Sequence, residues 1–281
     1  TGLPKRWDAP ISDINNWPRV VQLAWQLHED NGVLFSNKSY LIKPTDFDIP
    51  FESEKVHGIS TMLASQNGMD IQTVLDEFLK DLNSCEYIVG HNLKFDINVV
   101  ASELFRLDIE NQLLNKVVLD TCTENTANVC KLPGGKSGKF KFPTLVELYE
   151  NLFKNKFENA HNASADVEAN AMVFFELIRQ KLFDPSLIQD FENIYTKVSG
   201  TYSNQVGTFG INHINLKAES KKLKEQNQTE NLNTDDLVNN NSNSDYVHLH
   251  NNSQFSVLQS TTKISDLVKK TADYKMNAVA L

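Results

Sequence analysis

Two short segments of the chain combine histidine and aspartate at the same spacing. They read HNLKFD from His91 to Asp96 and HNASAD from His161 to Asp166, so each places an Asp five residues after a His. Carboxylates and imidazoles are the groups with which proteins hold metal ions and move protons. An Asp in a first helical turn can also simply complement the helix dipole, and a single His is more often structural. The repeated combination at two expected helix starts favours a shared chemical site.

The elements that must position these segments alternate between strands and helices. Asn31-Gly32 is typical of a hairpin turn, and the flanking residues 19–43 read as two antiparallel strands. EYIVG and KVVLD read as short strands further along the chain. Helices are expected over about 71–83 after the N-cap Asp70, from HNLKFD to about Leu107, in LVELYENLF after the Thr144/Glu147 capping box, and over about 163–182. This order predicts an α/β fold with a mixed sheet flanked by helices.

Composition and charge exclude several classes of protein. The 281 residues carry a net charge of −9, which argues against a general basic surface that coats DNA. No apolar run approaches 18 residues, and the first ten residues contain no apolar signal-peptide core, so we expect no membrane association. Three cysteines without a C-x-x-C pair indicate reduced thiols and a cytoplasmic protein.

At the level of motifs the chain resembles the DEDD-type 3′–5′ exonucleases. HNLKFD resembles their second motif, and HNASAD matches their third motif, H-x-A-x-x-D, in the His variant that includes bacterial proofreading subunits and oligoribonucleases. VHGIS at 56–60 resembles the upstream H-G-I-[ST] element, and TGLPKRWDAP resembles the sequence that follows the first motif, D-x-E-T. The resemblance covers about residues 1–182 and implies a ribonuclease H-like fold. Since D-x-E is absent, we expect the first strand of that fold to be missing and the chain as printed to be inactive.

The resemblance also implies a role for each matching residue. Hydrolysis would use two Mg²⁺ or Mn²⁺ ions held by about four carboxylates, of which Asp96 and Asp166 would be two. His161 would be the general base, since its ordinary pKa near 6.5 suits that task. DNA 3′ ends would be the substrate. The residues expected to contact it are Thr1, Gly2, Leu3, His57, Gly58, Ile59, His91, Asn92 and Phe95.

A glycine-rich basic loop follows at 131–143. It reads KLPGGKSGKFKFP and contains four lysines and two phenylalanines: Lys131, Lys136, Lys139, Lys141, Phe140 and Phe142. Such a loop suits backbone phosphates and a stacked base, but a solvated flexible loop has the same composition. Its spacing is not that of a P-loop.

The remainder of the chain changes character. We expect a C-terminal extension at 183–218, a disordered Asn-rich linker at 219–245, and one βαβ unit at 246–281. The last segment resembles the start of a PHP domain, the barrel-like domain of bacterial DNA polymerase III alpha subunits. His248 and His250 would then be metal ligands of that domain, although Asn252 stands where the family has a further His.

Three functions remain open from sequence. The order of exonuclease, linker and PHP start implies the proofreading segment of a replicative DNA polymerase, with partners such as a sliding clamp. A stand-alone exonuclease acting on RNA or short oligonucleotides is the second reading. An inactive exonuclease fold that binds nucleic acid or protein is the third, and it belongs to a different functional class.

Overall fold

The computed structural model describes residues 2–157 and 162–226. The predictions for Thr1, His161, His248 and His250 lie outside the described residues, as do most of the expected linker and the whole βαβ unit. The chain divides into two compact units, Thr1–Lys224 and Glu225–Leu281, and the fold described below is that of the first.

The predicted hairpin is confirmed. Strand β1 (Gln22–His28) pairs antiparallel with β2 (Leu34–Leu41), and the register shifts between Leu27 and His28. Gly32 in the turn has φ 86°, and a Cβ there would lie 2.9 Å from the ring of Tyr202. Both the backbone conformation and the close approach therefore require glycine.

The two other predicted strands form a separate pair. Strand β3 (Tyr87–Gly90) runs parallel to β4 (Val117–Asp120), with Gly90 opposite Asp120. One pair of strands is thus antiparallel and the other parallel. The single mixed sheet expected from the sequence is observed, within the described residues, as two two-stranded sheets. The fold is α/β, and the described chain contains no strand that joins the two pairs.

The predicted helices are found close to their expected bounds. Asp70 caps α3 through the N–H groups of Gln72 and Thr73 at 3.0 and 3.2 Å, and Thr144 and Glu147 form the expected capping box. The labelled α-helices are α1 (Phe51–His57), α2 (Thr61–Asn67), α3 (Ile71–Asn83), α4 (Leu93–Arg106), α5 (Glu124–Cys130), α6 (Leu145–Phe153), α7 (Ala163–Arg179) and α8 (Phe191–Thr201). Short 3₁₀ turns cover Gln112–Asn115, Lys136–Gly138 and Pro185–Leu187. Within the described ranges, none of the helices has the length and apolar character that crossing a bilayer requires.

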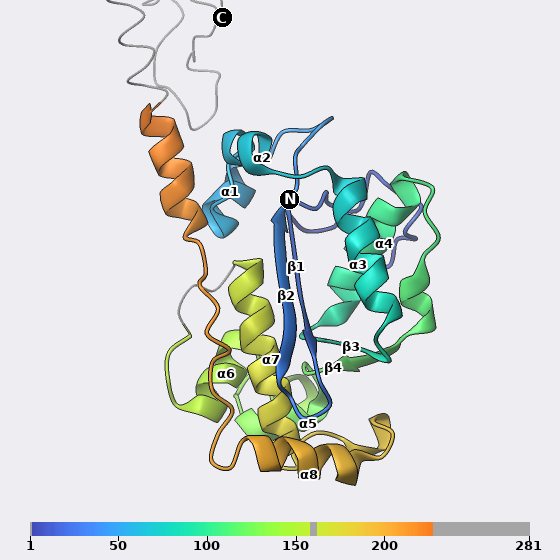
Figure 1. Cartoon of the computed structure of the whole chain (residues 1–281), viewed down its shortest axis with the longest axis vertical. Helices are drawn as coiled ribbons and strands as arrows, with labels where there is room; N and C mark the ends of the chain where they lie inside the picture. Colours follow the sequence, from blue (N-terminus) through green and yellow to red (C-terminus); the bar gives the residue numbers. More distant parts are fainter. Residues whose placement is uncertain (1, 158–161, 227–281) are drawn as a thin grey trace, which may run out of the picture. The chain divides into compact units, whose positions relative to one another are not determined.

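Helix α7 is the centre of the unit. It contacts β1, β2, β3, α6 and α8, and Figure 1 shows it running alongside the β1–β2 hairpin with α8 across its C-terminal end. Val173, Leu177 and Ile178 are fully buried. Because neighbours surround α7 on all sides, Asp166 in its first turn has a rigid support.

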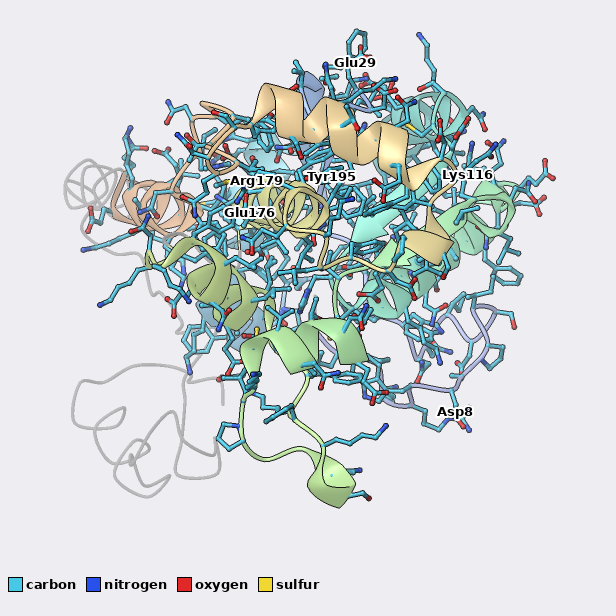
Figure 2. All side chains as sticks on the ribbon, turned by 90° about the horizontal axis from the view of Figure 1, so that it is seen from below. Asp8, Glu29, Lys116, Glu176, Arg179 and Tyr195 are labelled. Carbon is cyan, nitrogen blue, oxygen red and sulfur yellow. The ribbon has the colours of Figure 1, made fainter. Side chains whose placement is uncertain are left out.

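One buried carboxylate holds the C-terminal end of α7. Glu176 is fully buried and accepts hydrogen bonds from Arg179, from Gln180 and from the backbone N–H of Val206 at 3.0 Å. Burial alone would raise the pKa of Glu176, but these donors lower it below its ordinary value. Figure 2 shows Glu176 and Arg179 beside Tyr195 of α8.

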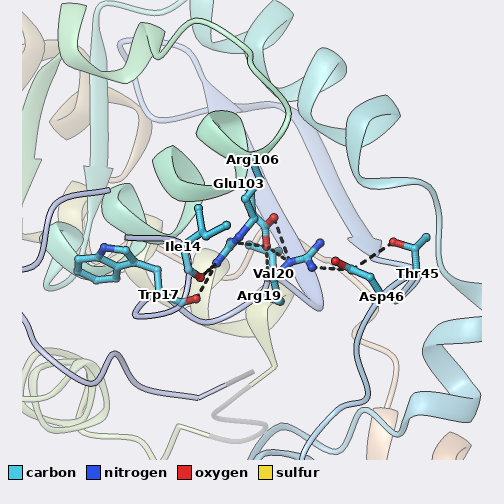
Figure 3. Close-up of polar contacts among 8 residues, drawn as sticks. All are labelled: Ile14, Trp17, Arg19, Val20, Thr45, Asp46, Glu103 and Arg106. Carbon is cyan, nitrogen blue, oxygen red and sulfur yellow. Dashed lines mark hydrogen bonds and ion pairs between the residues drawn. The ribbon is translucent and has the colours of Figure 1, made fainter. Parts of the chain in front are cut away.

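A second buried carboxylate anchors α4. Glu103 is 1% exposed and accepts from the Val20 N–H at 2.9 Å, while the guanidinium groups of Arg19 and Arg106 lie 3.1 and 3.2 Å from it. Arg19 also pairs with Asp46 at 2.6 Å (Figure 3). The network ties two loops to α4, the helix whose first turn carries Asp96.

The extension expected at 183–218, for which the sequence defines no elements, contains α8, and Phe191 and Val198 of that helix are buried. The linker expected at 219–245 needs correction, because residues 219–226 form most of a 216–226 helix. Leu216, Ser220 and the partly buried Leu223 lie on one face of that helix, and this face packs on the rest of the unit.

Candidate active site

Three aspartates are brought to one edge of the β3–β4 pair. Because the strands are parallel, their carboxyl ends meet at the same edge, where β3 leads into α4 and β4 ends at Asp120. Asp96 lies in the first turn of α4. Asp166 comes from the first turn of α7, which packs against β3.

Asp120 organises the start of α4. Its carboxylate accepts hydrogen bonds from the N–H groups of Asn92 at 2.8 Å, Leu93 at 3.0 Å and Cys122 at 2.7 Å. Asn92 has φ 59° and its own side chain makes no cap, so Asp120 supplies the cap from the neighbouring strand. Sequence analysis did not identify Asp120 as a site residue. The available signal was a carboxylate at the end of the predicted strand KVVLD, the position at which β4 ends in the structure.

The electrostatics join the three aspartates. Desolvation raises the pKa of Asp96 from 3.8 to about 6, and the negative charges of Asp120 and Asp166 add to the rise. Asp96 is nevertheless exposed to solvent. Neighbouring carboxylates that repel one another are a suitable environment for a divalent cation, whose preferred ligands are carboxylate oxygens. The donor type fits Mg²⁺ or Mn²⁺, although no group of three His, Cys, Asp or Glu in the described chain is placed to hold a metal by itself.

The segment beside His161 is anchored, although His161 itself is outside the described residues. Asn162 caps α7 by accepting from the Ser164 N–H at 3.1 Å, and it donates to the Ile214 carbonyl at 2.8 Å. Gln22 of β1 donates to the Asn162 side chain at 3.3 Å and accepts from the Ala163 N–H at 3.1 Å. The start of α7 is therefore fixed to β1.

A buried polar cluster holds the loop before the 216–226 helix against α7. His213 Nε2 lies 2.5 Å from a carboxylate oxygen of Glu168, and His213 Nδ1 lies 3.0 Å from the hydroxyl of Ser164. The other oxygen of Glu168 accepts from the Phe209 N–H at 2.7 Å. The cluster bridges the first two turns of α7, next to Asp166.

The HGIS element forms a tight turn between α1 and α2. Gly58 has φ 79°, and Ile59 is fully buried, so any contact of Ile59 with substrate would require this turn to open. His57 Nδ1 accepts from the Ile59 N–H at 3.1 Å, and desolvation lowers the pKa of His57 to about 4. The ring is therefore neutral at pH 7 with its proton on Nε2, which has no hydrogen-bond partner among the described residues.

Another residue expected to contact substrate, His91, forms hydrogen bonds within the protein. His91 faces inward: its Nε2 donates to the Pro143 carbonyl at 3.0 Å, its Nδ1 lies 2.9 Å from the Thr121 hydroxyl, and burial lowers its pKa. This arrangement is that of a structural His.

Four more of the residues expected to contact substrate lie near the start of α4 or at the beginning of the chain. Asn92 is exposed, and the ring of Phe95 lies 5.7 Å from that of Trp7. Leu3 is 74% exposed, and Gly2 has φ 139°. The structure does not bring these residues into one described pocket with His57.

The basic loop lies next to this edge. Pro143 at its end contacts His91, and Phe142 is 52% exposed. Lys139 and Lys141 pair with Glu124 and Glu147 at 2.8 and 2.7 Å, so two of its four lysines are partly neutralised.

Comparison with known proteins identifies the family. The family model described as Exonuclease (RNase T) matches residues 29–174, just over half of the chain. Similar solved structures include Escherichia coli exonuclease I with a dA16 oligonucleotide, at 19% identity and TM-score 0.46 over 63% of this chain and 39% of that one. A zinc-bound complex of the same Escherichia coli enzyme with single-stranded DNA gives 20% identity and TM-score 0.47 over 63% and 39%. The chain thus spans about 39% of the length of these structures. A search of curated proteins finds no match. On the extent of the family match, this chain belongs to the exonuclease (RNase T) family.

Proposed function

We propose that this chain carries the exonuclease site of an enzyme that removes nucleotides from the 3′ ends of DNA by metal-assisted hydrolysis. The observation that carries the proposal is the electrostatic coupling of Asp96 with Asp120 and Asp166, which three separate elements bring to one edge of the β3–β4 pair. Membership of the exonuclease family supplies the reaction class.

Asp96 and Asp166 are the proposed metal ligands, since each lies in the first turn of a helix with a fixed start. When bound, Mg²⁺ or Mn²⁺ ions would activate water and neutralise charge at phosphorus. Asp120 acts as a positioning residue, because its carboxylate is committed to three backbone N–H groups. His161 is the proposed general base, and its sequence neighbour Asn162 is anchored to β1.

A two-ion site needs about four converging carboxylates, and the described residues do not bring even three ligating groups together. We therefore propose that further carboxylates complete the site, as the D-x-E pair of the first motif would.

His57 is the proposed contact with the terminal nucleotide of the substrate. Its Nε2–H is a donor without an acceptor among the described residues, and burial keeps the ring neutral. Such a donor suits an oxygen of the terminal nucleotide once the HGIS turn opens, since Nε2 itself is buried. Trp7, which is 53% exposed beside Phe95, offers an aromatic face near the start of α4.

For the whole protein we propose the proofreading part of a replicative DNA polymerase, in which residues 246–281 begin a PHP domain and His248 and His250 bind a further metal. The support is the sequence order alone. A stand-alone exonuclease acting on RNA or short oligonucleotides is the alternative. Reading the coding sequence after Leu281 separates them: a PHP continuation supports the polymerase, and an immediate stop codon contradicts it.

The reaction itself is tested with the chain extended at its N-terminus by a D-x-E-containing first motif. A single-stranded DNA labelled at its 5′ end should yield a ladder that shortens from the 3′ end in Mn²⁺, with no products in EDTA. The cleavage rate on an RNA of the same sequence, compared with the rate on the DNA, gives the preference between ribose and deoxyribose. Shortening from the 5′ end, or tight binding without cleavage, would overturn the proposal in favour of another polarity or of a binding module.

A further inference from the structure

A groove lies between α1 and the 216–226 helix, and none of the aspartates of the active site lines it. It has a volume of about 240 Å³, and residues of both helices line it, including Phe51, Lys55, Gly58, Lys217, Lys221 and Lys224. In Figure 1 the 216–226 helix runs beside α1 at one end of the unit.

The two walls of the groove are held together by specific contacts. The Ser220 hydroxyl donates to the Gly58 carbonyl at 2.6 Å and accepts from the Ser60 N–H at 3.1 Å. A Cβ on Gly58 would lie 2.8 Å from the Lys217 backbone nitrogen, so the helix rests directly on this turn. Lys224 forms an ion pair with Glu54 of α1. The groove is thus a fixed feature of the fold.

The charge of the groove is opposite to that of the whole chain. Four of its lining residues are lysines and one is Glu54, whereas the chain carries a net charge of −9. Lys217, Lys221 and Lys224 are exposed and follow the i, i+4, i+7 spacing that places them on one face of the helix. A concentration of ammonium groups on an otherwise acidic protein indicates a polyanionic ligand.

An exposed aromatic ring lies at the same groove. Phe51 is 63% exposed, and the ammonium of Lys55 lies 4.5 Å from the centre of its ring. Exposed aromatic rings combined with lysines are the features with which proteins bind single-stranded nucleic acid: the rings stack on bases and the cations contact phosphates. An acidic peptide would use the lysines but would have little use for the ring.

We infer that this groove binds the backbone and one base of the single strand whose 3′ end enters the active site. The inference rests on the proposed nuclease function. Gly58 belongs both to the lining of the groove and to the HGIS turn, so the groove begins directly beside His57. The 216–226 helix is then a substrate-binding element of the exonuclease.

The test is equilibrium binding of the full 281-residue chain to fluorescein-labelled dT12, followed by anisotropy in EDTA so that cleavage plays no part. Lys217→Gln combined with Lys221→Gln should weaken binding about tenfold at 100 mM salt. It should also reduce the slope of log K against log salt by about 1.4, since each single-strand phosphate contact contributes about 0.7. The matched control is Lys80→Gln combined with Lys197→Gln, which removes the same charge from α3 and α8 and should leave the slope unchanged.

Phe51→Leu separates stacking from charge. It should weaken dT12 binding about tenfold without changing the salt slope, because base stacking involves no counterion release. An unchanged melting temperature in each variant shows that the fold is intact.

The outcomes distinguish this inference from the function on which it rests. If the wild-type chain binds dT12 but the Lys217/Lys221 variant stays within twofold, the groove is not the path of the strand, while the proposed nuclease function stands. If the wild-type chain does not bind dT12 at all, the inference is overturned, while the proposed nuclease function is decided separately by the cleavage ladder of the chain that carries the first motif. If a polyglutamate peptide of equal charge competes as well as unlabelled dT12, the groove serves an acidic protein partner and the inference is wrong.

Discussion

Replacing Asp96 with asparagine should stabilise the metal-free protein at neutral pH. The folded protein raises the pKa of Asp96 from 3.8 to about 6 through desolvation and the charges of Asp120 and Asp166. A carboxyl with a raised pKa binds its proton more tightly in the folded than in the unfolded state. Below pH 3.8 the carboxyl is protonated in both states, and the raised pKa does not change the free energy of unfolding. As the pH rises from 3.8 through 6, the unfolded chain ionises more readily than the folded protein, so the free energy of unfolding falls.

The magnitude follows from the two pKa values. One pH unit of pKa change corresponds to about 1.4 kcal/mol, so a fully buried group would contribute a penalty of about 3 kcal/mol above pH 7. Because Asp96 is exposed to solvent, water screens the repulsion, and we expect about 1 kcal/mol. About a third of the penalty would remain at pH 4.5, where the unfolded chain is mostly ionised and the folded site is mostly protonated.

Urea denaturation in EDTA measures this directly. Asp96→Asn should exceed the wild type in free energy of unfolding by about 1 kcal/mol at pH 8 and by about 0.3 kcal/mol at pH 4.5. Asp76→Asn, on the exposed face of α3, is the control and should show no such pH-dependent gain. An Asp96→Asn variant that is less stable than the wild type at pH 8 would refute the reasoning, because the carboxylate would then be stabilising.

Three further substitutions test the supports of the site. Asp120→Asn should cost about 1–3 kcal/mol of unfolding free energy in urea denaturation, because one amide oxygen cannot replace a carboxylate that accepts three N–H groups; an unchanged value would contradict its role at the start of α4. Glu103→Gln should cost about 3 kcal/mol by leaving two arginines beside a neutral buried group, whereas Asp46→Asn, at the exposed end of the network, should cost under 1 kcal/mol. Glu176→Gln should lower the free energy of unfolding by about 3 kcal/mol at pH 7. This difference should shrink as the pH falls below the lowered pKa of Glu176, because the wild type then loses the stabilising charge. A difference that does not depend on pH would contradict the role of Glu176 as an ion-pair partner.

Elements with a local signal were predictable from sequence. The Asn31-Gly32 hairpin, the Asp70 cap and the Thr144 capping box each depend on contacts within a few residues, and the structure has them where expected. The start of α7 at Ala163 also followed from local pattern.

Features that depend on distant contacts were missed. Asp120 gains its role only because β4 lies parallel to β3 and faces Asn92, 28 residues earlier. Residues 219–226 were read as linker because their composition is polar, yet Ser220 contacts Gly58 and Ser60 across about 160 residues of sequence. The hydrogen bond from His91 Nε2 to the Pro143 carbonyl, 52 residues later in the chain, likewise has no local signal.

The most direct test of the account is the Mn²⁺-dependent hydrolysis rate of the chain extended by the first motif, compared with the same protein carrying Asp166→Ala. The rate should be measured on a single-stranded DNA with a free 3′ end, with folding checked by circular dichroism. If Asp166 is a metal ligand, the substitution should abolish turnover while leaving the fold intact. A rate within about tenfold of the unsubstituted protein would contradict the assignment of the active site, since a lost metal ligand removes a larger part of the stabilisation at phosphorus.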